Sequence, residues 1–202
     1  MKRKTSIKTL AARAAMTLLL AVLTATTAWA QEAISGLTYN TAGGYYEIKD
    51  AQDLVDLATY VNAGNDASGK TFKQTANITF AHTSDWNDSS SNEINFNGIG
   101  YVTKNFKGSY YGQGFTISGV RMYSPGGLYY SLFRVTEGAI IDGIVLSDSR
   151  ITANDFSGGI VGETNQNSIV NNCHVRSNVL IHNIYNYEVH MGDAKKVGAC
   201  TR

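Results

Sequence analysis

The chain has 202 residues, with 17 Lys and Arg, 16 Asp and Glu, 20 glycines, one proline and two cysteines. Beyond the N-terminal segment its basic residues are not clustered, which argues against a protein that binds nucleic-acid backbones. Two cysteines are too few for a disulfide framework.

Residues 1–30 have the pattern of a secretory signal peptide. Four basic residues precede position 9, an apolar run extends from Ala14 to Ala25, and Ala28-Trp29-Ala30 is a small-x-small cleavage site. An uncleaved membrane anchor is the alternative, but the run is shorter than the ~20 apolar residues that a span needs. We therefore expect cleavage after Ala30, export to the cell surface or the medium, and no membrane span afterwards.

Removal of this leader changes the charge of the chain. Five basic residues and no acidic ones lie in it, which leaves 12 basic against 16 acidic residues and a formal charge of −4. The remaining 172 residues suffice for one domain. Low charge with many Gly, Asn, Ser and Thr residues is typical of short strands joined by polar corners.

The first expected elements follow a flexible lead-in over residues 31–44. Tyr45 to Ile48 alternates as a strand, and apolar residues then recur with helical spacing up to Val61. Asp50 is a suitable N-cap, so we predict a helix over residues 50–62. A helix placed before stacked strands can close their open end, and we expect it to act as a cap. A ligand-binding helix is the alternative.

Residues 71–80 are predicted as the first pair of strands, and residues 82–97 as a long polar excursion. The excursion carries Trp86 among the acidic residues Asp85, Asp88 and Glu93. Long loops on a repeat scaffold often bind ligands, so Trp86 is a candidate contact residue. A hydrophobic lid over the core is the alternative.

A repeat follows. The segments 116–122, 140–146 and 169–175 align at spacings of 24 and 29 positions. The alignment predicts three inward columns, which are Ile117/Ile141/Val170, Val120/Ile144/Cys173 and Met122/Leu146/Val175. Pairs that tolerate tight corners separate the first two columns: Ser118-Gly119, Asp142-Gly143 and Asn171-Asn172.

These columns predict the fold. A unit that is apolar on one side buries that side only when it is stacked on its neighbours. The sequence therefore favours an all-β protein, a right-handed parallel β-helix over residues 45–182 with a short N-terminal capping α-helix. Phe106 and Tyr110, which precede the first copy, are expected to point inward.

One segment also resembles a known family. Gly159-Ile160-Val161-Gly162, followed by Asn165, Ile169, Asn172 and Cys173, is similar to the GLUG motif, named for its Gly-Leu-aliphatic-Gly core. That motif recurs in adhesin-like bacterial surface proteins and in the non-catalytic region of some IgA-cleaving metallopeptidases. The stretch from Tyr45 to Ile181 resembles capped β-helix starts of secreted proteins from gut Bacteroidetes. The preceding coil departs from the motif, with Ser131 and Arg134 in place of glycines.

The C-terminal part differs from the rest. Residues 183–202 lose the repeat and are predicted as an irregular tail, which leaves the last coil without an evident cap. Either further coils are missing because the chain is truncated, or a partner chain packs on this end. The pairing state of the second cysteine, Cys200, is not determined by its position.

We expect no catalytic, cofactor-binding or metal-binding residues. The chain has no His-Glu-x-x-His motif, and its four histidines lack a metal-ligand spacing. Polysaccharide-cleaving β-helix enzymes use convergent carboxylates with a basic residue. The nearby candidates for such a set are Asp142, Asp148, Asp155, Arg150 and Arg176.

Two functions remain open. The first is a non-catalytic, adhesin-like module that binds a host glycoprotein or glycan, or serves as a scaffold. Exposed aromatic side chains can stack on sugar rings, and the candidates are Trp86, Tyr111, Tyr123, Tyr129 and Tyr130. The alternative is a carbohydrate-active enzyme, similar to a polysaccharide lyase, that is incomplete in this chain.

Overall fold

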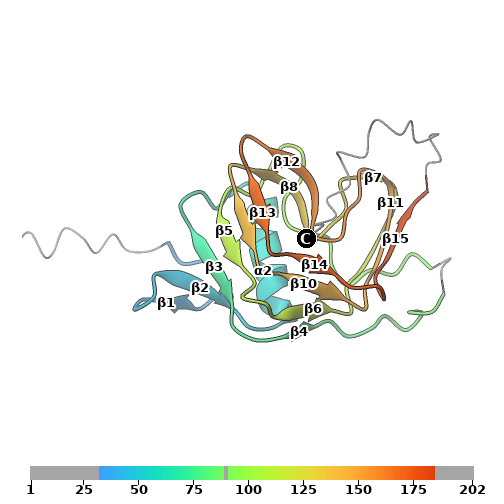
Figure 1. Ribbon diagram of the computed structural model, residues 1–202, viewed down its shortest axis with the longest axis horizontal. Coiled ribbons are helices and arrows are strands. Elements are labelled where there is room, and N and C mark those ends of the chain that lie inside the picture. Colours follow the sequence, from blue (N-terminus) through green and yellow to red (C-terminus); the bar gives the residue numbers. More distant parts are fainter. Residues whose placement is uncertain (1–31, 89–90, 185–202) are drawn as a thin grey trace, which may run out of the picture. The chain divides into compact units, whose positions relative to one another are not determined.

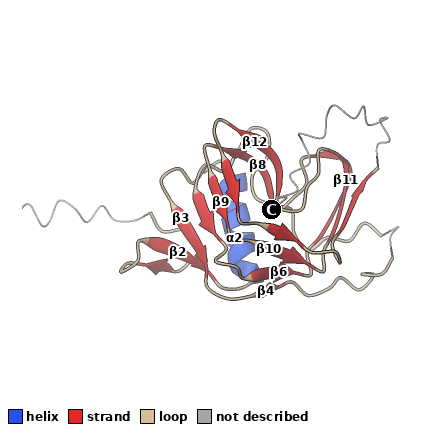
Figure 2. Cartoon of the chain, in the orientation of Figure 1, coloured by secondary structure: helices blue, strands red, loops and turns tan. Residues whose placement is uncertain are grey.

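The computed structural model describes residues 32–88 and 91–184, which form a β-solenoid of about five turns. Strands from successive turns stack in parallel into four sheets (Figures 1 and 2). The predicted parallel β-helix is confirmed. The predicted signal peptide and most of the predicted tail lie outside the described residues.

The third and fourth turns are complete, because each contributes one strand to each sheet. The third turn consists of β5 (Ser109–Tyr111), β6 (Thr116–Ser118), β7 (Arg121–Leu128) and β8 (Phe133–Glu137). The fourth consists of β9 (Ile140–Asp142), β10 (Val145–Ser147), β11 (Arg150–Asp155) and β12 (Val161–Asn165). The fifth turn contributes β13 (Ile169–Asn171), β14 (His174–Val175) and β15 (Leu180–Asn183). We number the sheets first to fourth in the order in which the chain visits them.

The first two turns replace strands by other elements. In the first turn, β2 (Tyr45–Ile48) is followed by α2 (Ala51–Asn62). In the second, β3 (Thr71–Gln74) and β4 (Ile78–Thr79) precede a long connection to β5. With β1 (Tyr39–Asn40) at its edge, the first sheet therefore has the strand order β1-β2-β3-β5-β9-β13, and the third sheet has β15-β11-β7.

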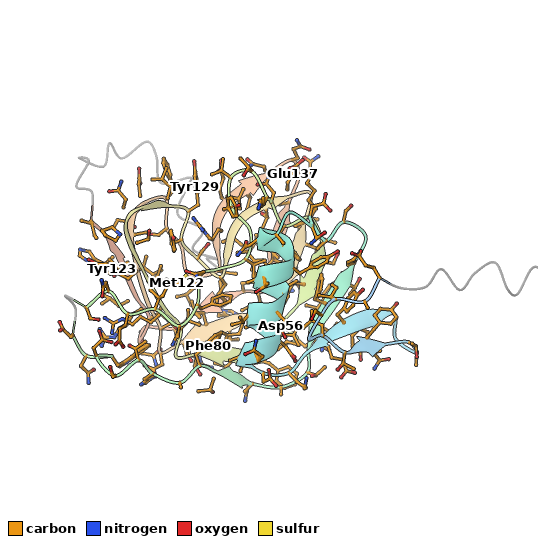
Figure 3. The ribbon with its side chains drawn as sticks, turned by 180° about the vertical axis from the view of Figure 1, so that it is seen from behind. Asp56, Phe80, Met122, Tyr123, Tyr129 and Glu137 are labelled. Carbon is orange, nitrogen blue, oxygen red and sulfur yellow. The ribbon has the colours of Figure 1, made fainter. Side chains whose placement is uncertain are left out.

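The helix forms as predicted and closes the first turn. The Asp50 carboxylate accepts the N–H of Asp53 at 3.0 Å, which satisfies a helix-terminal donor. The buried side chains of α2 are Asp53, Leu54, Leu57, Ala58 and Val61. Asn62 ties the helix to the second turn, because its side chain donates to the carbonyl oxygen of Gly98 and accepts the N–H of Gly100. Figure 3 shows α2 in front of the sheets in the view from behind.

The lead-in differs from the prediction of a flexible segment. The strand β1 (Tyr39–Asn40) pairs antiparallel with β2, and Ile34 is buried. The pairing has a physical reason, since β2 would otherwise present an unpaired edge. Residues 34–44 therefore fold onto the solenoid.

The predicted columns are buried, but the register of one copy is wrong. Seven of the nine side chains are at most 2% exposed, and Val170 and Val175 are partly buried against them. Ile141 pairs with Val170, and Leu146 with Val175, so the spacing of 29 is confirmed.

The spacing of 24 is wrong. Ile117 pairs with Leu146 rather than with Ile141, whose partner in the third turn is Tyr110. Met122 pairs with Ile151 in the third sheet. Val120 directly precedes the paired residues Arg121 and Arg150, so it corresponds to Ser149 rather than to Ile144. The earliest copy was aligned five positions out of place.

The corner residues have the backbone conformations that such turns require. Gly119, Gly143 and Asn172 have φ of +74°, +71° and +51°. Gly162 is needed for a different reason, because a Cβ there would lie 2.7 Å from the carbonyl oxygen of Arg134 in the preceding turn. Asn183, placed in the tail by the sequence, ends β15 and pairs with Ala153. Within the described ranges no helix is long and apolar enough to cross a bilayer.

Candidate functional site

The long connection after β4 lies against the outer side of the third sheet, on the right in Figure 1. Asn95 fixes its returning end to β7, which is the edge strand of that sheet. The Asn95 side chain accepts the N–H of Arg121 at 2.7 Å and donates to the carbonyl oxygen of Gly119 at 2.7 Å. One amide side chain thus satisfies main-chain groups that the missing strand would have paired.

Arg121 holds the outer part of the connection. Its guanidinium donates to the carbonyl oxygens of Asp85 at 2.8 Å and Asp88 at 2.7 Å, with a longer contact to that of Ser91. The Asp85 carboxylate lies 3.5 Å from the same guanidinium, whose side chain is only 5% exposed. Because the cation is buried among its acceptors, Arg121 fixes this segment onto the sheet.

Two depressions lie between this segment and the third sheet, and we call them together the groove. The larger one has a volume of about 280 Å³ and is lined by Trp86, Asp148, Arg150 and residues 177–180. The smaller one, of about 30 Å³, is lined by loop residues together with outward side chains of β7, β11 and β15, among them Tyr123 and His182. Arg150 and Leu180 line both depressions and therefore stand between them.

Trp86 forms one wall of the larger depression. The His82 ring stacks on the indole in parallel, with 3.8 Å between the ring centroids. His82 Nε2 lies 3.0 Å from a carboxylate oxygen of Asp148, so the ring is held from two sides. The Arg150 guanidinium lies 5.4 Å from the indole centroid, a cation–π distance.

Arg150 makes no hydrogen bond or ion pair through its side chain in the part of the chain that the structure describes. Its guanidinium therefore presents its N–H donors to the groove. Next to it are a carboxylate, an aromatic wall and the exposed side chain of Leu180. An arrangement of this kind suits a ligand that combines apolar faces with hydroxyl or carboxylate groups.

The structure brings two of the five predicted aromatic contact residues to the groove, Trp86 and Tyr123. Tyr111 lies in β5 of the first sheet, where it pairs with Lys73 and Asp142. Figure 3 shows Tyr123 and Tyr129 well apart.

Tyr129 and Tyr130 follow β7 and contact neighbouring side chains. The Tyr129 ring stacks on Phe156 with 5.2 Å between centroids, and the Arg134 guanidinium lies 4.1 Å from the ring centroid of Tyr130. Burial raises the pKa of Tyr129 and lowers the pKa of Arg134. Both tyrosines thus support the junction between the third and fourth sheets.

The side chains considered for an enzyme do not converge on one place. Asp142 lies in the first sheet and accepts a hydrogen bond from Asn172. Asp148 and Arg150 belong to the groove, whereas Asp155 ends β11. In the two described ranges no three His, Cys, Asp or Glu residues are grouped so that they could hold a metal ion. Cys173 is buried, and Cys200 and His190 lie outside those ranges.

A second, larger pocket lies beside α2. It has a volume of about 490 Å³ and is lined by Val55, Ala58, Thr59, Asn62 and Ala63 of the helix end and by residues 94–97. These residues carry no charge and no exposed aromatic ring apart from the edge of the buried Phe96. The groove offers more specific chemistry, and we take it as the candidate site.

Sequence reasoning missed two parts of this site. Arg121 was assigned no role, although it lies 29 positions before Arg150 and shares its column. His82 was considered only as one of four histidines that lack a metal-ligand spacing. The repeat spacing was the available signal for Arg121, but its shortest hydrogen bonds are to backbone carbonyls, which leave no trace in the sequence.

Comparison with known proteins gives no relative for this chain, since no family model, curated protein or solved structure matches it.

Proposed function

We propose that this chain is an exported, non-catalytic solenoid module of the adhesin-like type, which binds a glycan, such as that of a host glycoprotein, in the groove. The observation that carries the proposal is the depression lined by Trp86, Asp148 and Arg150 between the connection and the third sheet. An indole contacts the apolar face of a sugar ring, while a carboxylate and a guanidinium bond its hydroxyl groups.

Two features of the sequence support the location and the class. The leader over residues 1–30 supports export, and the resemblance of residues 159–173 to the GLUG motif supports a surface protein. Export predicts a mature chain that begins at Gln31, which mass spectrometry of the secreted protein tests directly. A chain that retains residues 1–30 in the membrane fraction contradicts it.

Glycan binding is tested with the full chain on a glycan array, followed by calorimetry on the glycans that bind. Trp86→Ala is expected to weaken binding about tenfold, since an aromatic contact contributes ~1.5 kcal/mol. Tyr111→Ala is the matched control, because it removes a partly exposed aromatic side chain from the first sheet, away from the groove, and it should leave affinity unchanged. If no glycan binds, the proposal fails and a scaffold role remains.

The enzyme alternative makes a different prediction. Incubation with pectin, alginate and mucin glycans, with and without calcium, should release no product. Turnover that Asp142→Asn or Asp148→Asn abolishes would overturn the non-catalytic assignment.

A further inference from the structure

We propose that the ligand of the groove is an acidic glycan, and that Arg150 binds its carboxylate. The inference rests on the proposed glycan-binding function and adds the chemical class of the sugar. It starts from the difference between two arginines that occupy the same position in successive turns.

The first step concerns the burial and the contacts of the Arg150 guanidinium. Arg121, one turn earlier, is surrounded by acceptors from the connection and is almost fully buried. The connection does not extend over Arg150 in the same way. Arg150 is partly buried on a strand, yet among the described residues its guanidinium makes only the cation–π contact with Trp86. A guanidinium held against an aromatic ring has little freedom, so its donors are preorganised for an incoming acceptor.

The second step is the charge of the neighbouring groups. Asp148 lines the same depression, but its Oδ2 already contacts His82 at 3.0 Å, and it forms no ion pair with Arg150. The other side chains of this depression, Ser177, Asn178, Val179 and Leu180, carry no charge. Arg150 is therefore the cation of the larger depression that lacks a contacting anion within the described ranges.

The third step is the shape of the acceptor. A guanidinium presents two parallel N–H groups, which match the two oxygens of a carboxylate. Asp148 and Asn178 then face the ring hydroxyls of the same sugar, and the indole faces its apolar side. Uronic acids and sialic acids both combine these groups. The shared chemistry is a carboxylate on a hydroxylated ring.

The experiment compares each acidic glycan with its carboxyl-reduced counterpart, measured by calorimetry on the full chain. One arm uses a sialylated trisaccharide, a second uses an oligouronate, and a third uses a neutral oligosaccharide. A sulfated neutral oligosaccharide is the fourth arm. We expect at least one acidic glycan to bind about tenfold more tightly than its reduced form, the effect of a charge-assisted bond of ~1.5 kcal/mol.

The variants assign that preference to one residue. Arg150→Gln should abolish the preference for the acidic form while neutral binding persists, and Arg150→Lys should retain part of it because it keeps the charge without the planar fork. Arg176→Gln is the matched control, since Arg176 is an exposed arginine of the fifth turn, one turn after Arg150, and does not line the groove. Unchanged urea unfolding of Arg150→Gln establishes that the variant is folded.

Each outcome separates this inference from the function on which it rests. If acidic and reduced glycans bind equally, or if Arg150→Gln keeps the preference, glycan binding stands and the carboxylate assignment fails. If the sulfated glycan binds as tightly as the acidic ones, the site accepts anions in general and the assignment fails as well. If no arm binds, both proposals fall.

Discussion

Arg121 and Arg150 occupy the same position of the third sheet, one turn apart, but their guanidinium groups have different surroundings. Arg121 is sealed by carbonyl oxygens of the connection that precedes β5, and its side chain is 5% exposed. Arg150 lines both depressions of the groove. The same residue type in the same column is a structural anchor in one turn and a candidate ligand contact in the next.

The difference comes from a single insertion. The third and fourth turns connect their sheets by short corners, whereas the second turn sends residues 81–88 and 91–95 outward before the chain returns to the core at Phe96. This segment covers the outer side of β7. It does not extend fully over β11, where Trp86 contacts Arg150. A candidate binding site thus arises in a regular repeat because a long loop from one turn forms a wall beside the next turn.

Removal of the anchor should have the largest effect. Arg121→Met leaves the Asp85 carboxylate without its counter-ion and several carbonyl oxygens without their donor, so we expect a loss of about 3 kcal/mol in the free energy of unfolding. Urea unfolding measures it. Arg150→Met is the matched control, because the side chain makes no bond in the described residues, and it should change stability by less than about 0.5 kcal/mol.

The two variants also differ in what they do to the loop. Limited proteolysis should cut residues 82–97 sooner in Arg121→Met than in the unchanged chain, and Arg150→Met should not accelerate the cut. Equal losses of stability in both variants would show that Arg121 and Arg150 contribute equally to the fold, which would contradict the role of Arg121 as the anchor.

The comparison presupposes that the two arginines are in register, and a designed cross-link tests this. Ser118 and Ser147 are paired neighbours on β6 and β10, so their cysteine variants should form a disulfide in a Cys200→Ser background. The closed loop predicts a stabilisation of up to about 3 kcal/mol. The pair Ser118→Cys and Asp142→Cys, which a spacing of 24 would place side by side, should remain reduced. Non-reducing mass spectrometry distinguishes the two.

The error in register has a physical origin. Ser118-Gly119 and Asp142-Gly143 are both corner pairs, preceded and followed by aliphatic residues that point inward. The first turns the chain from the second sheet to the third, the second from the first sheet to the second. Every corner of a solenoid imposes the same pattern, so the pattern alone does not identify the corner. The interval of 29 was readable because residues 140–146 and 169–175 turn the same corner.

The helix and the inward positions were predictable for a related reason. N-caps, helical spacing and burial act on neighbouring residues and leave local patterns, as in Asp50 and the buried face of α2. The groove depends on contacts between distant residues, such as His82 with Asp148 or Arg121 with backbone carbonyls. The sequence alone identifies Trp86 as a candidate ligand-contact residue, but it does not show which strand the side chain faces.

The groove around Arg150 is held together by weaker contacts than those of Arg121, and a substitution of His82 tests how much they contribute. His82→Ala removes the ring that stacks on Trp86 and contacts Asp148, and we expect a loss of about 1 kcal/mol in stability. The chain has two tryptophans, so in a Trp29→Phe background the fluorescence reports Trp86 alone and should shift to longer wavelength. His174→Ala, an exposed histidine on β14, should change neither quantity. An unshifted emission in His82→Ala would contradict the stack.

The smallest effect is expected at a partly exposed ion pair on another part of the molecule, which contrasts with the buried Arg121. Glu137 accepts a hydrogen bond from Asn105 at 2.8 Å and lies 3.3 Å from Lys107, and Figure 3 shows it beyond the upper end of α2, well apart from Tyr123. The hydrogen bond from Asn105 is the larger cause that lowers the pKa of Glu137, and Lys107 adds to it.

A carboxylate with a lowered pKa in the folded state stabilises the fold above its unfolded pKa of about 4.3, and this stabilisation is lost as the pH falls through the folded value. Glu137→Gln should therefore be slightly less stable than the unchanged chain at pH 7, and the two urea midpoints should converge below pH 4. Because the Asn105 bond is the largest single cause and Lys107 adds both a bond and a charge, Asn105→Ala and Lys107→Met should each reduce this pH dependence. An unchanged pH dependence in Asn105→Ala would mean that the amide bond does not hold the carboxylate in its ionised form.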